Sequence, residues 1–239
     1  MRRDHRPYRL ARAGVRFHAA WTRYVLAPQL DALGEGSIVV CPWRVQVHGA
    51  RIRIGRFAYI VAARDAEVSL QTWSDPRHQG EIIFGDHCLV SPGVRLSSAS
   101  RIEIGEGTML ARGAYLTDAD WHDIVDRTQE VGRTAPIVLG RNVWIGDGAI
   151  ITKGVTIGDN SVVGARAVVT RPVPSNVIVA GNPARVVREI GAEGEFRSLA
   201  ALHDAPPEEI AARHRYLLSL ALGDNSWRGW LRARLTHRD

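Results

Sequence analysis

Residues 137–184, IVLGRNVWIGDGAIITKGVTIGDNSVVGARAVVTRPVPSNVIVAGNPA, carry a pattern that returns every six residues. An aliphatic side chain marks each repeat, at Leu139, Ile145, Ile151, Ile157, Val163 and Val169. A small residue follows each time, at Gly140, Gly146, Thr152, Gly158, Gly164 and Thr170. An amphipathic helix needs apolar spacings of three and four residues, and a simple strand alternates with a period of two. Neither structure gives a strict period of six.

A solenoid with short flat sides explains this period, because each side presents one large inward side chain and then turns a corner. Valine, isoleucine and threonine dominate the repeats, which indicates that the sides are parallel strands. The sequence therefore predicts an all-β solenoid, a hexapeptide-repeat β-helix.

The same period extends toward the N-terminus with interruptions. It runs through Phe84, Val90 and Leu96, slips by two residues, and continues through Ile104, Leu110 and Leu116. Residues 34–60 open the solenoid irregularly, and residues 61–80 lose the pattern and indicate a loop or a distorted coil. The pattern breaks again over residues 117–136, where polar and charged residues predict a loop that projects from the solenoid.

The two ends of the chain differ from the repeat. Apolar residues from Val15 to Val25 recur at helical spacing and Pro28 marks the end of a helix, while residues 1–14 are expected to be frayed. Pro206 and Pro207 lead into a further helix closed by Gly223, and a short last helix follows. We therefore predict an N-terminal basic helix (1–33), a β-helix domain (34–190) and a C-terminal helical extension (191–239).

The terminal helices allow more than one role. Seven arginines stand against one aspartate up to Arg23, so the N-terminal helix has a basic face. This face could contact an anionic membrane, but a helix packed on the protein with its other face in water is the preferred interpretation. The C-terminal helices are expected to cap the solenoid. Substrate contact and an oligomer seam are the alternatives.

Composition limits the classes of partner. The chain has 239 residues, 45% of them hydrophobic, and a net charge of +6 from 31 basic and 25 acidic residues. Lys153 is the only lysine, so nearly all of the positive charge is arginine, which forms paired hydrogen bonds with phosphate groups. A phosphorylated cofactor fits this composition. Nucleic acid is not expected as a partner, since no recognition motif accompanies the charge.

The cysteines and the N-terminal sequence help to predict the cellular compartment of the protein. Cys41 and Cys88 are the only cysteines and lie far apart in sequence, which predicts no disulfide framework. No apolar run follows the first arginines, and no stretch approaches the length of a membrane span. We therefore expect a cytoplasmic protein.

The segment VWIGDGAIITKGVTIGDNSVVGARAVVTRPVPSNVIVAGNPARVV, residues 143–187, resembles the hexapeptide-repeat acyltransferases. It is most similar to the CoA-dependent O-acetyltransferases of sugars, such as those acting on galactosides and maltose. The resemblance covers about residues 80–190. It implies a left-handed parallel β-helix, acetyl-CoA as cosubstrate, and a homotrimer whose active sites lie in clefts between two prisms.

The resemblance also implies a set of cofactor-binding residues. Trp144 matches the tryptophan that lines the cofactor channel, and Ala165 matches the alanine that lets the pantetheine arm pass close to the backbone. Thr170 and Arg171 match the pair near the adenosine end, where the family usually has lysine in place of arginine. Arg185 and Arg188 match positions that meet the CoA phosphates.

The catalytic assignment departs from the family pattern. Acyl transfer to a hydroxyl group needs a base for the hydroxyl proton and donors for the tetrahedral oxyanion. The family places its histidine two residues after the threonine that corresponds to Thr117, and Ala119 stands there. His122 is the only histidine of this loop, so we assign it as the base, with Asp120 or Asp123 holding its imidazole ring.

Two alternatives follow from these departures. Some left-handed β-helix trimers are zinc carbonic anhydrases, which need three histidines for an open site. This chain offers His87 and His122 with no third histidine nearby, and Arg127 stands instead, so no metal is expected. The sequence therefore predicts an acetyl-CoA-dependent O-acyltransferase acting on a sugar or glycan hydroxyl. The alternative is a non-catalytic trimeric scaffold or CoA-binding protein, which Ala119 favours.

Overall fold

The computed structural model describes residues 4–191, 195–203 and 207–236. The chain forms two compact units. The terminal unit consists of Met1–Ala20 with Leu202–Asp239, and the repeat unit consists of Trp21–Ala201. Each unit is described by itself below. The division into domains at residues 33 and 190 stays a prediction.

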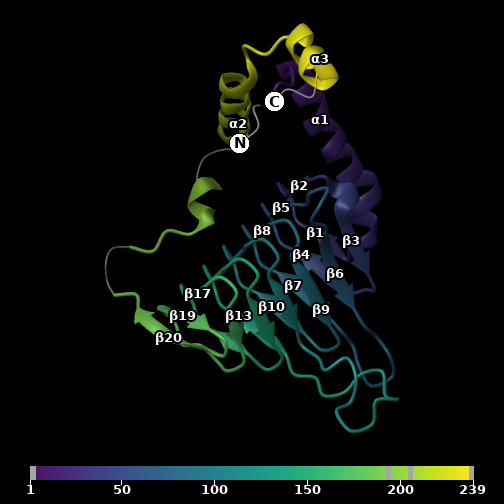
Figure 1. The fold of residues 1–239 in the computed structure, drawn as a ribbon, viewed down its shortest axis with the longest axis vertical. Coiled ribbons are helices and arrows are strands. Elements are labelled where there is room, and N and C mark those ends of the chain that lie inside the picture. Colours follow the sequence, from purple (N-terminus) through teal and green to yellow (C-terminus); the bar gives the residue numbers. More distant parts are fainter. Residues whose placement is uncertain (1–3, 192–194, 204–206, 237–239) are drawn as a thin grey trace. The chain divides into compact units, whose positions relative to one another are not determined.

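Three sheets make up the repeat unit (Figure 1). Sheet A contains β1 (Ala32–Leu33), β4 (Ile52–Ile54), β7 (Ile82–Phe84), β10 (Ile102–Ile104), β13 (Ile137–Leu139) and β16 (Thr156–Ile157). Sheet B contains β2 (Ile38–Val40), β5 (Tyr59–Val61), β8 (Leu89–Val90), β11 (Met109–Leu110), β14 (Trp144–Ile145), β17 (Val162–Val163), β19 (Val177–Gly181) and β20 (Ala184–Glu189). Sheet C contains β3 (Val45–His48), β6 (Val68–Thr72), β9 (Arg95–Ser98), β12 (Tyr115–Thr117), β15 (Ile150–Thr152) and β18 (Val168–Val169).

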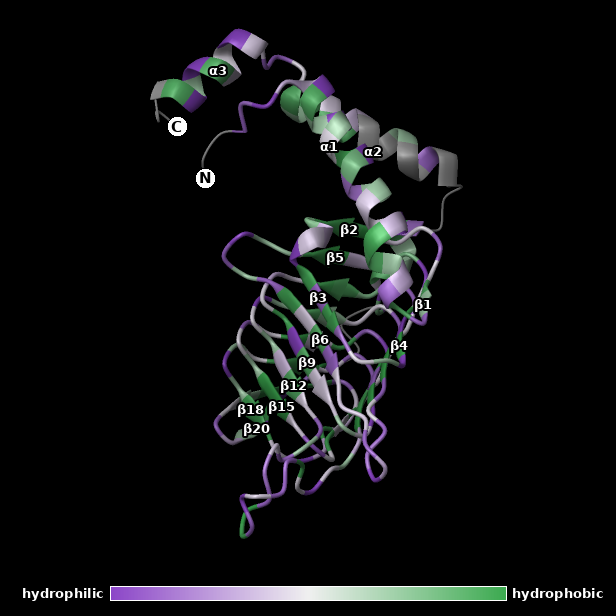
Figure 2. Ribbon diagram, turned by 90° about the vertical axis from the view of Figure 1, so that its right-hand side faces the viewer, coloured by the Kyte–Doolittle hydropathy of each residue, from purple (hydrophilic) through white to green (hydrophobic). Residues whose placement is uncertain are grey.

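Consecutive strands visit the three sheets in rotation. From β1 to β18, each strand enters the next sheet and pairs in parallel with the strand three places before it, as Figure 2 shows for sheet C. The predicted parallel strands are therefore confirmed. The rotation ends at β19, which joins sheet B beside β17, and β20 turns back to pair with β19 in antiparallel orientation.

The aliphatic residues of the six-residue pattern form the core. Leu139, Ile145 and Ile151 are each at most 1% exposed, and each stands in register with the corresponding residue of the neighbouring coils. Sheet A, for example, stacks Ile54, Phe84, Ile104, Leu139 and Ile157 in one row. Apolar side chains at the same position of successive repeats thus belong to one buried core cluster.

The small residue after each aliphatic residue reflects contact between coils. A Cβ atom on Gly105 would lie 2.3 Å from the carbonyl oxygen of Gly140, and one on Gly55 would lie 2.5 Å from that of Gly85. Both approaches are closer than real Cβ contacts allow, so only glycine fits this corner of sheet A. Sheet C has threonine at the equivalent corner, and the Thr152 hydroxyl donates a hydrogen bond of 3.0 Å to the carbonyl oxygen of Val169.

The irregular segments sit between regular strands. Within residues 61–80, β6 (Val68–Thr72) continues sheet C, and residues 73–81 form the loop that follows it. The loop of residues 118–136 connects β12 with β13. Both loops therefore leave the repeat unit at the end of a strand of sheet C, before the chain enters sheet A.

The helices confirm the terminal predictions with one correction. The N-terminal helix α1 spans Tyr8–Trp21 and continues through η1 (Thr22–Leu26) and η2 (Ala27–Gln29), so the predicted start at Val15 and the fraying of residues 8–14 are wrong. The C-terminal segment contains η4 (Leu199–His203), α2 (Pro207–Leu222) and α3 (Trp227–Thr236), with Gly223 directly after α2 as predicted. The remaining short helix, η3, spans Pro42–Arg44. Within the described ranges, the structure contains no helix of the length and hydropathy that a membrane span requires.

Candidate functional site

The loop of residues 118–136 has an ordered base. Ala119 and Thr134 form an antiparallel bridge, and the N–H of Asp120 donates to the carbonyl oxygen of Arg133 at 2.9 Å. The N–H of Ala135 donates to the carbonyl oxygen of Asp118 at 3.0 Å. The two arms of the loop are therefore paired where they leave the repeat unit, and the tip of the loop lies beyond this pairing.

A buried carboxylate anchors the first arm. Asp118 is fully buried and accepts hydrogen bonds from the Ser98 hydroxyl at 2.6 Å, the Ala99 N–H at 2.7 Å and the Ser100 N–H at 3.0 Å. Burial raises the pKa of Asp118, because a charged carboxylate loses its hydration, and these hydrogen bonds oppose the rise. The loop is therefore tied to the preceding coil by a polar group inside the protein.

A small apolar cluster lies behind the tip. Ala99, Ala119 and Val131 are buried together with Trp121 packed against them, and the Trp121 indole N–H donates to the Thr117 hydroxyl at 2.9 Å. Ala119, two residues after Thr117, is only 6% exposed. The Ala119 side chain is buried inside the base of the loop, whereas His122 is exposed on the loop.

The three predicted catalytic residues do not form a hydrogen-bonded group. Asp120 pairs with the Lys153 ammonium group at 2.6 Å, on the neighbouring coil. The Asp123 carboxylate accepts from the N–H groups of Asp126 and Val125, which lowers the pKa of Asp123. Among the described contacts, none joins His122 to either carboxylate. The pairing of His122 with Asp120 or Asp123 stays a prediction.

The outer face of sheet B carries part of the predicted cofactor site. Strand register places Trp144, Val162, Ile178 and Arg188 in one row across β14, β17, β19 and β20. Trp144 is 49% exposed, whereas the next residue, Ile145, is fully buried, as expected when successive side chains point to opposite faces. The structure therefore brings Trp144 and Arg188 to the same side of the same sheet.

The other predicted cofactor residues lie at corners and in the terminal hairpin. Ala165 is exposed and stacks on the corner that follows the Trp144 strand, where a Cβ atom on Gly146 would lie 2.7 Å from the Ala165 nitrogen. Arg185 is the second residue of β20 and is exposed, and its guanidinium group donates to the carbonyl oxygen of Ala184 at 2.8 Å. Thr170 and Arg171, both exposed, follow β18 at the end of sheet C.

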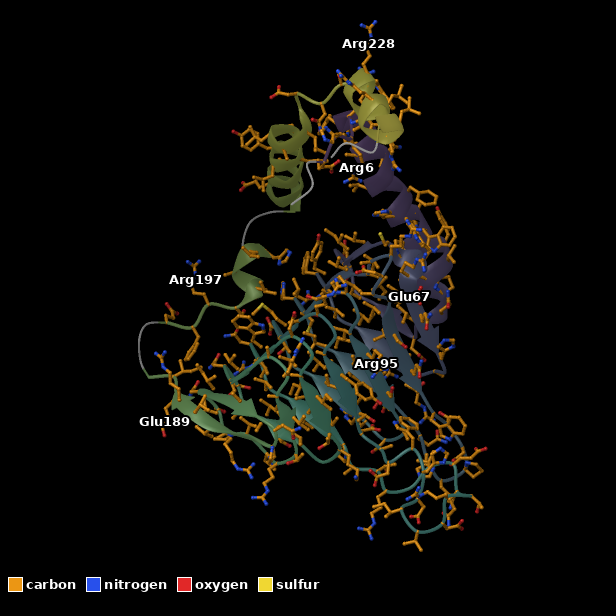
Figure 3. The ribbon with its side chains drawn as sticks, in the orientation of Figure 1. Arg6, Glu67, Arg95, Glu189, Arg197 and Arg228 are labelled. Carbon is orange, nitrogen blue, oxygen red and sulfur yellow. The ribbon has the colours of Figure 1, made fainter. Side chains whose placement is uncertain are left out.

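The predicted site residues thus form two groups on one chain. Trp144, Ala165, Arg185 and Arg188 belong to sheet B and its edges. Thr170 and Arg171 follow β18 in the same way that the loop carrying His122 follows β12, so they leave the same end of sheet C. On sheet C, the Arg95 guanidinium carbon lies 4.3 Å from the Tyr115 ring centroid, and Figure 3 labels Arg95.

The sequence predicted a loop or a distorted coil within residues 61–80 but assigned no site residue to the loop that follows β6 at this end of sheet C. In the loop that follows β6, Asp75 accepts hydrogen bonds from the ring of His78 at 3.0 Å and from the Trp73 indole N–H at 3.2 Å. The contact with His78, with further bonds from backbone N–H groups, lowers the pKa of Asp75. Trp73 is 40% exposed. The only signal in the sequence was the aromatic and charged composition of a segment that lost the repeat.

The cysteines and acidic groups indicate no metal centre in the part of the chain that the structure describes. No three histidine, cysteine, aspartate or glutamate side chains gather there as a metal site would require. Cys41 and Cys88 are free thiols. Burial raises the pKa of Cys88 to about 12, so this thiol is a poor nucleophile.

Comparison with known proteins supports the resemblance. Residues 136–171 match the family described as bacterial transferase hexapeptide (six repeats). The chain is 36% identical over 143 residues to the galactoside O-acetyltransferase of Escherichia coli K12, covering 60% of this chain and 56% of that protein. It is 26% identical over 174 residues to the galactoside O-acetyltransferase of Lactococcus lactis subsp. lactis IL1403, covering 73% and 70%.

The chain thus spans little more than half the length of the Escherichia coli relative. Among solved structures, a galactoside acetyltransferase in complex with coenzyme A is 29% identical, with 75% of this chain and 76% of that chain covered and a TM-score of 0.49. The resemblance of the repeat region to hexapeptide-repeat acetyltransferases is confirmed by the family match and the sequence relatives.

Proposed function

We propose that this protein, a relative of the hexapeptide-repeat acetyltransferases, transfers an acetyl group from acetyl-CoA to a hydroxyl group of a sugar or glycan. The identity to a galactoside O-acetyltransferase over 143 residues is the observation that carries the proposal. We also propose that the three sheets close into the left-handed β-helix that the resemblance implies. Since acetyl-CoA is made inside cells, the cytoplasm is the proposed site of action.

The proposed chemistry assigns His122 as the general base. A neutral imidazole would take the proton of the acceptor hydroxyl as its oxygen attacks the thioester carbonyl carbon, and coenzyme A would leave as the thiol after the tetrahedral intermediate collapses. His122 is exposed on the loop of residues 118–136, so an acceptor can reach it. Lys153 and backbone N–H groups each occupy one oxygen of Asp120 and Asp123, so we propose that the His122 ring is oriented by a remaining carboxylate oxygen, by the acceptor or by a second chain.

The proposed cofactor contacts rest on sheet B. Trp144 supplies an exposed aromatic surface for the pantetheine arm, and Arg185 and Arg188 supply positive charge for the phosphates. Backbone N–H groups are proposed to stabilise the oxyanion. The site needs no metal ion for this reaction.

We further propose a homotrimer. The sheet B group and the His122 loop occupy different sides of one chain, since β14 belongs to sheet B and β12 to sheet C. A neighbouring copy would bring the cofactor surface of one chain beside the loop of the other. Light scattering tests this arrangement, because a stable monomer of 26.3 kDa at assay concentration would contradict a shared site.

A non-catalytic CoA-binding scaffold is the second candidate. Ala119 stands buried where the family has its histidine, and His122 has no carboxylate partner within the described part of the chain. An assay for the release of free CoA thiol distinguishes the enzyme from the scaffold. Incubation with acetyl-CoA and a panel of mono- and oligosaccharides should release free CoA thiol with at least one acceptor. Binding of CoA without release for any sugar would favour the scaffold.

A further inference from the structure

The net positive charge of the chain lies in the terminal unit. Residues 1–20 and 202–239 contain twelve arginines and six acidic residues, whereas residues 21–201 contain nineteen basic and nineteen acidic residues. The whole net charge of +6 therefore belongs to the terminal unit, and the repeat unit is neutral. Charge on one small unit indicates a partner with a negative surface.

Hydrogen bonds join the two ends of the chain in this unit. The Asn225 side-chain amide, between α2 and α3, donates to the carbonyl oxygen of Asp4 at 2.6 Å and to that of Arg6 at 3.0 Å. The backbone of Asn225 is fixed in turn by the carbonyl oxygen of Leu222 at 3.1 Å. The arginines of α1 and those of α3 thus belong to one compact structure.

The last helix exposes an apolar stripe flanked by arginines. Trp227, Leu231 and Leu235 are 51%, 50% and 82% exposed, and their spacing of four residues places them on one face of α3. Arg228 and Arg232 each follow a residue of this stripe, and Figure 3 shows Arg228 pointing away from the helix. Figure 2 shows the resulting alternation of hydrophobic and hydrophilic residues along α3.

Helix α1 repeats this combination, and α2 adds exposed apolar residues. On α1, Val15 and Phe17 are 45% and 53% exposed and alternate with the exposed Arg16. On α2, Leu217 and Leu220 are 53% and 63% exposed. A large aromatic or leucine side chain in water is unremarkable alone, but two helices of one unit that combine exposed apolar residues with arginine, as α1 and α3 do, are typical of interfacial binding.

We propose that the terminal unit docks on an anionic phospholipid surface. Arginines would contact the lipid phosphates, and the stripe of Trp227, Leu231 and Leu235 would enter the boundary between headgroups and acyl chains. A nucleic acid would satisfy the charge but leave the leucines in water. A second copy of the unit would cover the leucines but bring like charges together. The docking does not rest on the proposed acetyl transfer.

Vesicle sedimentation with the full-length protein tests this inference. We expect binding to vesicles of phosphatidylcholine with 30% phosphatidylglycerol to exceed binding to pure phosphatidylcholine by about tenfold or more, with a decrease at high salt. The variant Arg16→Gln/Arg228→Gln should bind the anionic vesicles about 20-fold more weakly. The variant Leu231→Ser/Leu235→Ser should lose at least about 30-fold.

A variant that loses the same number of arginines from the repeat unit tests whether vesicle binding depends on the terminal unit or only on the net charge of the chain. Arg64→Gln/Arg197→Gln removes two exposed arginines from the repeat unit and should leave vesicle binding unchanged. Equal binding to both vesicles, or equal losses for both arginine variants, would overturn the proposal. Failure to bind vesicles would also overturn it. In that case, binding of an RNA oligonucleotide would indicate a nucleic-acid partner. A self-associated species whose mass falls in the Leu231→Ser/Leu235→Ser variant would instead indicate a second copy of the chain. Far-UV circular dichroism verifies that each variant keeps its helices.

Discussion

The Ser98 hydroxyl oxygen lies 2.6 Å from a carboxylate oxygen of Asp118, and both side chains are fully buried. Ser98 also accepts a hydrogen bond from the Glu81 N–H at 3.2 Å, and its hydroxyl lies 3.0 Å from the Glu81 carbonyl oxygen. Glu81 ends the loop that follows β6, and Asp118 begins the loop that carries His122. One buried polar pair therefore fixes the bases of both loops.

Asp118→Asn should destabilise the protein. Each carboxylate oxygen accepts from a backbone N–H group, so the amide NH₂ group of asparagine must face a donor at one of the two positions. An unsatisfied buried polar group costs about 1–3 kcal/mol, which thermal or urea unfolding measures. An unfolding free energy equal to that of the wild type would show that the loop base adapts without Asp118.

The stability difference between these two proteins should also depend on pH. The pKa of Asp118 in the folded state lies above its ordinary value of 3.8, so the folded state holds the proton more tightly than the unfolded state. The wild-type advantage should therefore be greatest below pH 3.8 and decline as pH rises through the folded-state pKa. Urea unfolding of both proteins at a series of pH values checks this, and an advantage that grows with pH would contradict the sign.

Trp144→Ala and Ile145→Ala should separate function from stability. Trp144 is 49% exposed and Ile145 fully buried, although they are neighbours on β14. Ile145→Ala should lower the free energy of unfolding by about 2–5 kcal/mol, since it leaves a cavity in the core. Trp144→Ala should cost much less stability but weaken CoA binding in calorimetric titration. Undiminished CoA affinity in Trp144→Ala would remove the tryptophan from the proposed channel.

Arg185→Ala and Arg188→Ala should weaken CoA binding through its phosphates. Hydrogen bonds to charged groups are worth about 1.5–3 kcal/mol, so each change should raise the Kd for CoA by about one to two decades. Pantetheine, which lacks the phosphates, should bind almost as before. Arg64→Ala in the same unit serves as the control for net charge. Equal losses for CoA and pantetheine would show that these arginines do not contact phosphate.

The pair of Lys153 and Asp120 should contribute little to stability. Their side chains are 32% and 27% exposed, and exposed ion pairs are typically worth less than about 1 kcal/mol. A double-mutant cycle with Lys153→Gln and Asp120→Asn, read by urea unfolding, should therefore give a small coupling free energy. A coupling of several kcal/mol would mean that this contact, rather than Asp118, holds the loop.

The sequence was sufficient to predict the parallel strands and the buried aliphatic residues of the repeat unit because one six-residue rule places both. An aliphatic residue recurs at every sixth position, so the spacing alone predicts that Leu139 and Ile151 are buried, as they are. The same six-residue pattern also predicts the buried polar residues Ser98 and Asp118, which the sequence analysis did not identify. Ser98 and Asp118 each stand two residues after an inward leucine, at Leu96 and Leu116, and side chains two apart on a strand share a face. A polar residue in an inward position predicts a buried polar pair.

The candidate site was harder to predict because it depends on loops. The spacing of Asp120, His122 and Asp123 suggested a hydrogen-bonded group, but Lys153 on the next coil and backbone N–H groups within the loop compete for the carboxylates. Such competition follows from the stacking of coils and the turn of the loop, which local sequence does not encode. The placement of Trp144 with Arg188 was accessible only through strand register.

The central claim is that His122 is the base for acetyl transfer, and the kcat of His122→Ala with a productive acceptor tests it most directly. His122 is exposed and absent from the core, so the variant should fold and bind CoA with an unchanged Kd. We predict that kcat falls by about 10²–10⁴-fold, because the base acts only in the transition state. A kcat equal to that of the wild type would contradict the claim.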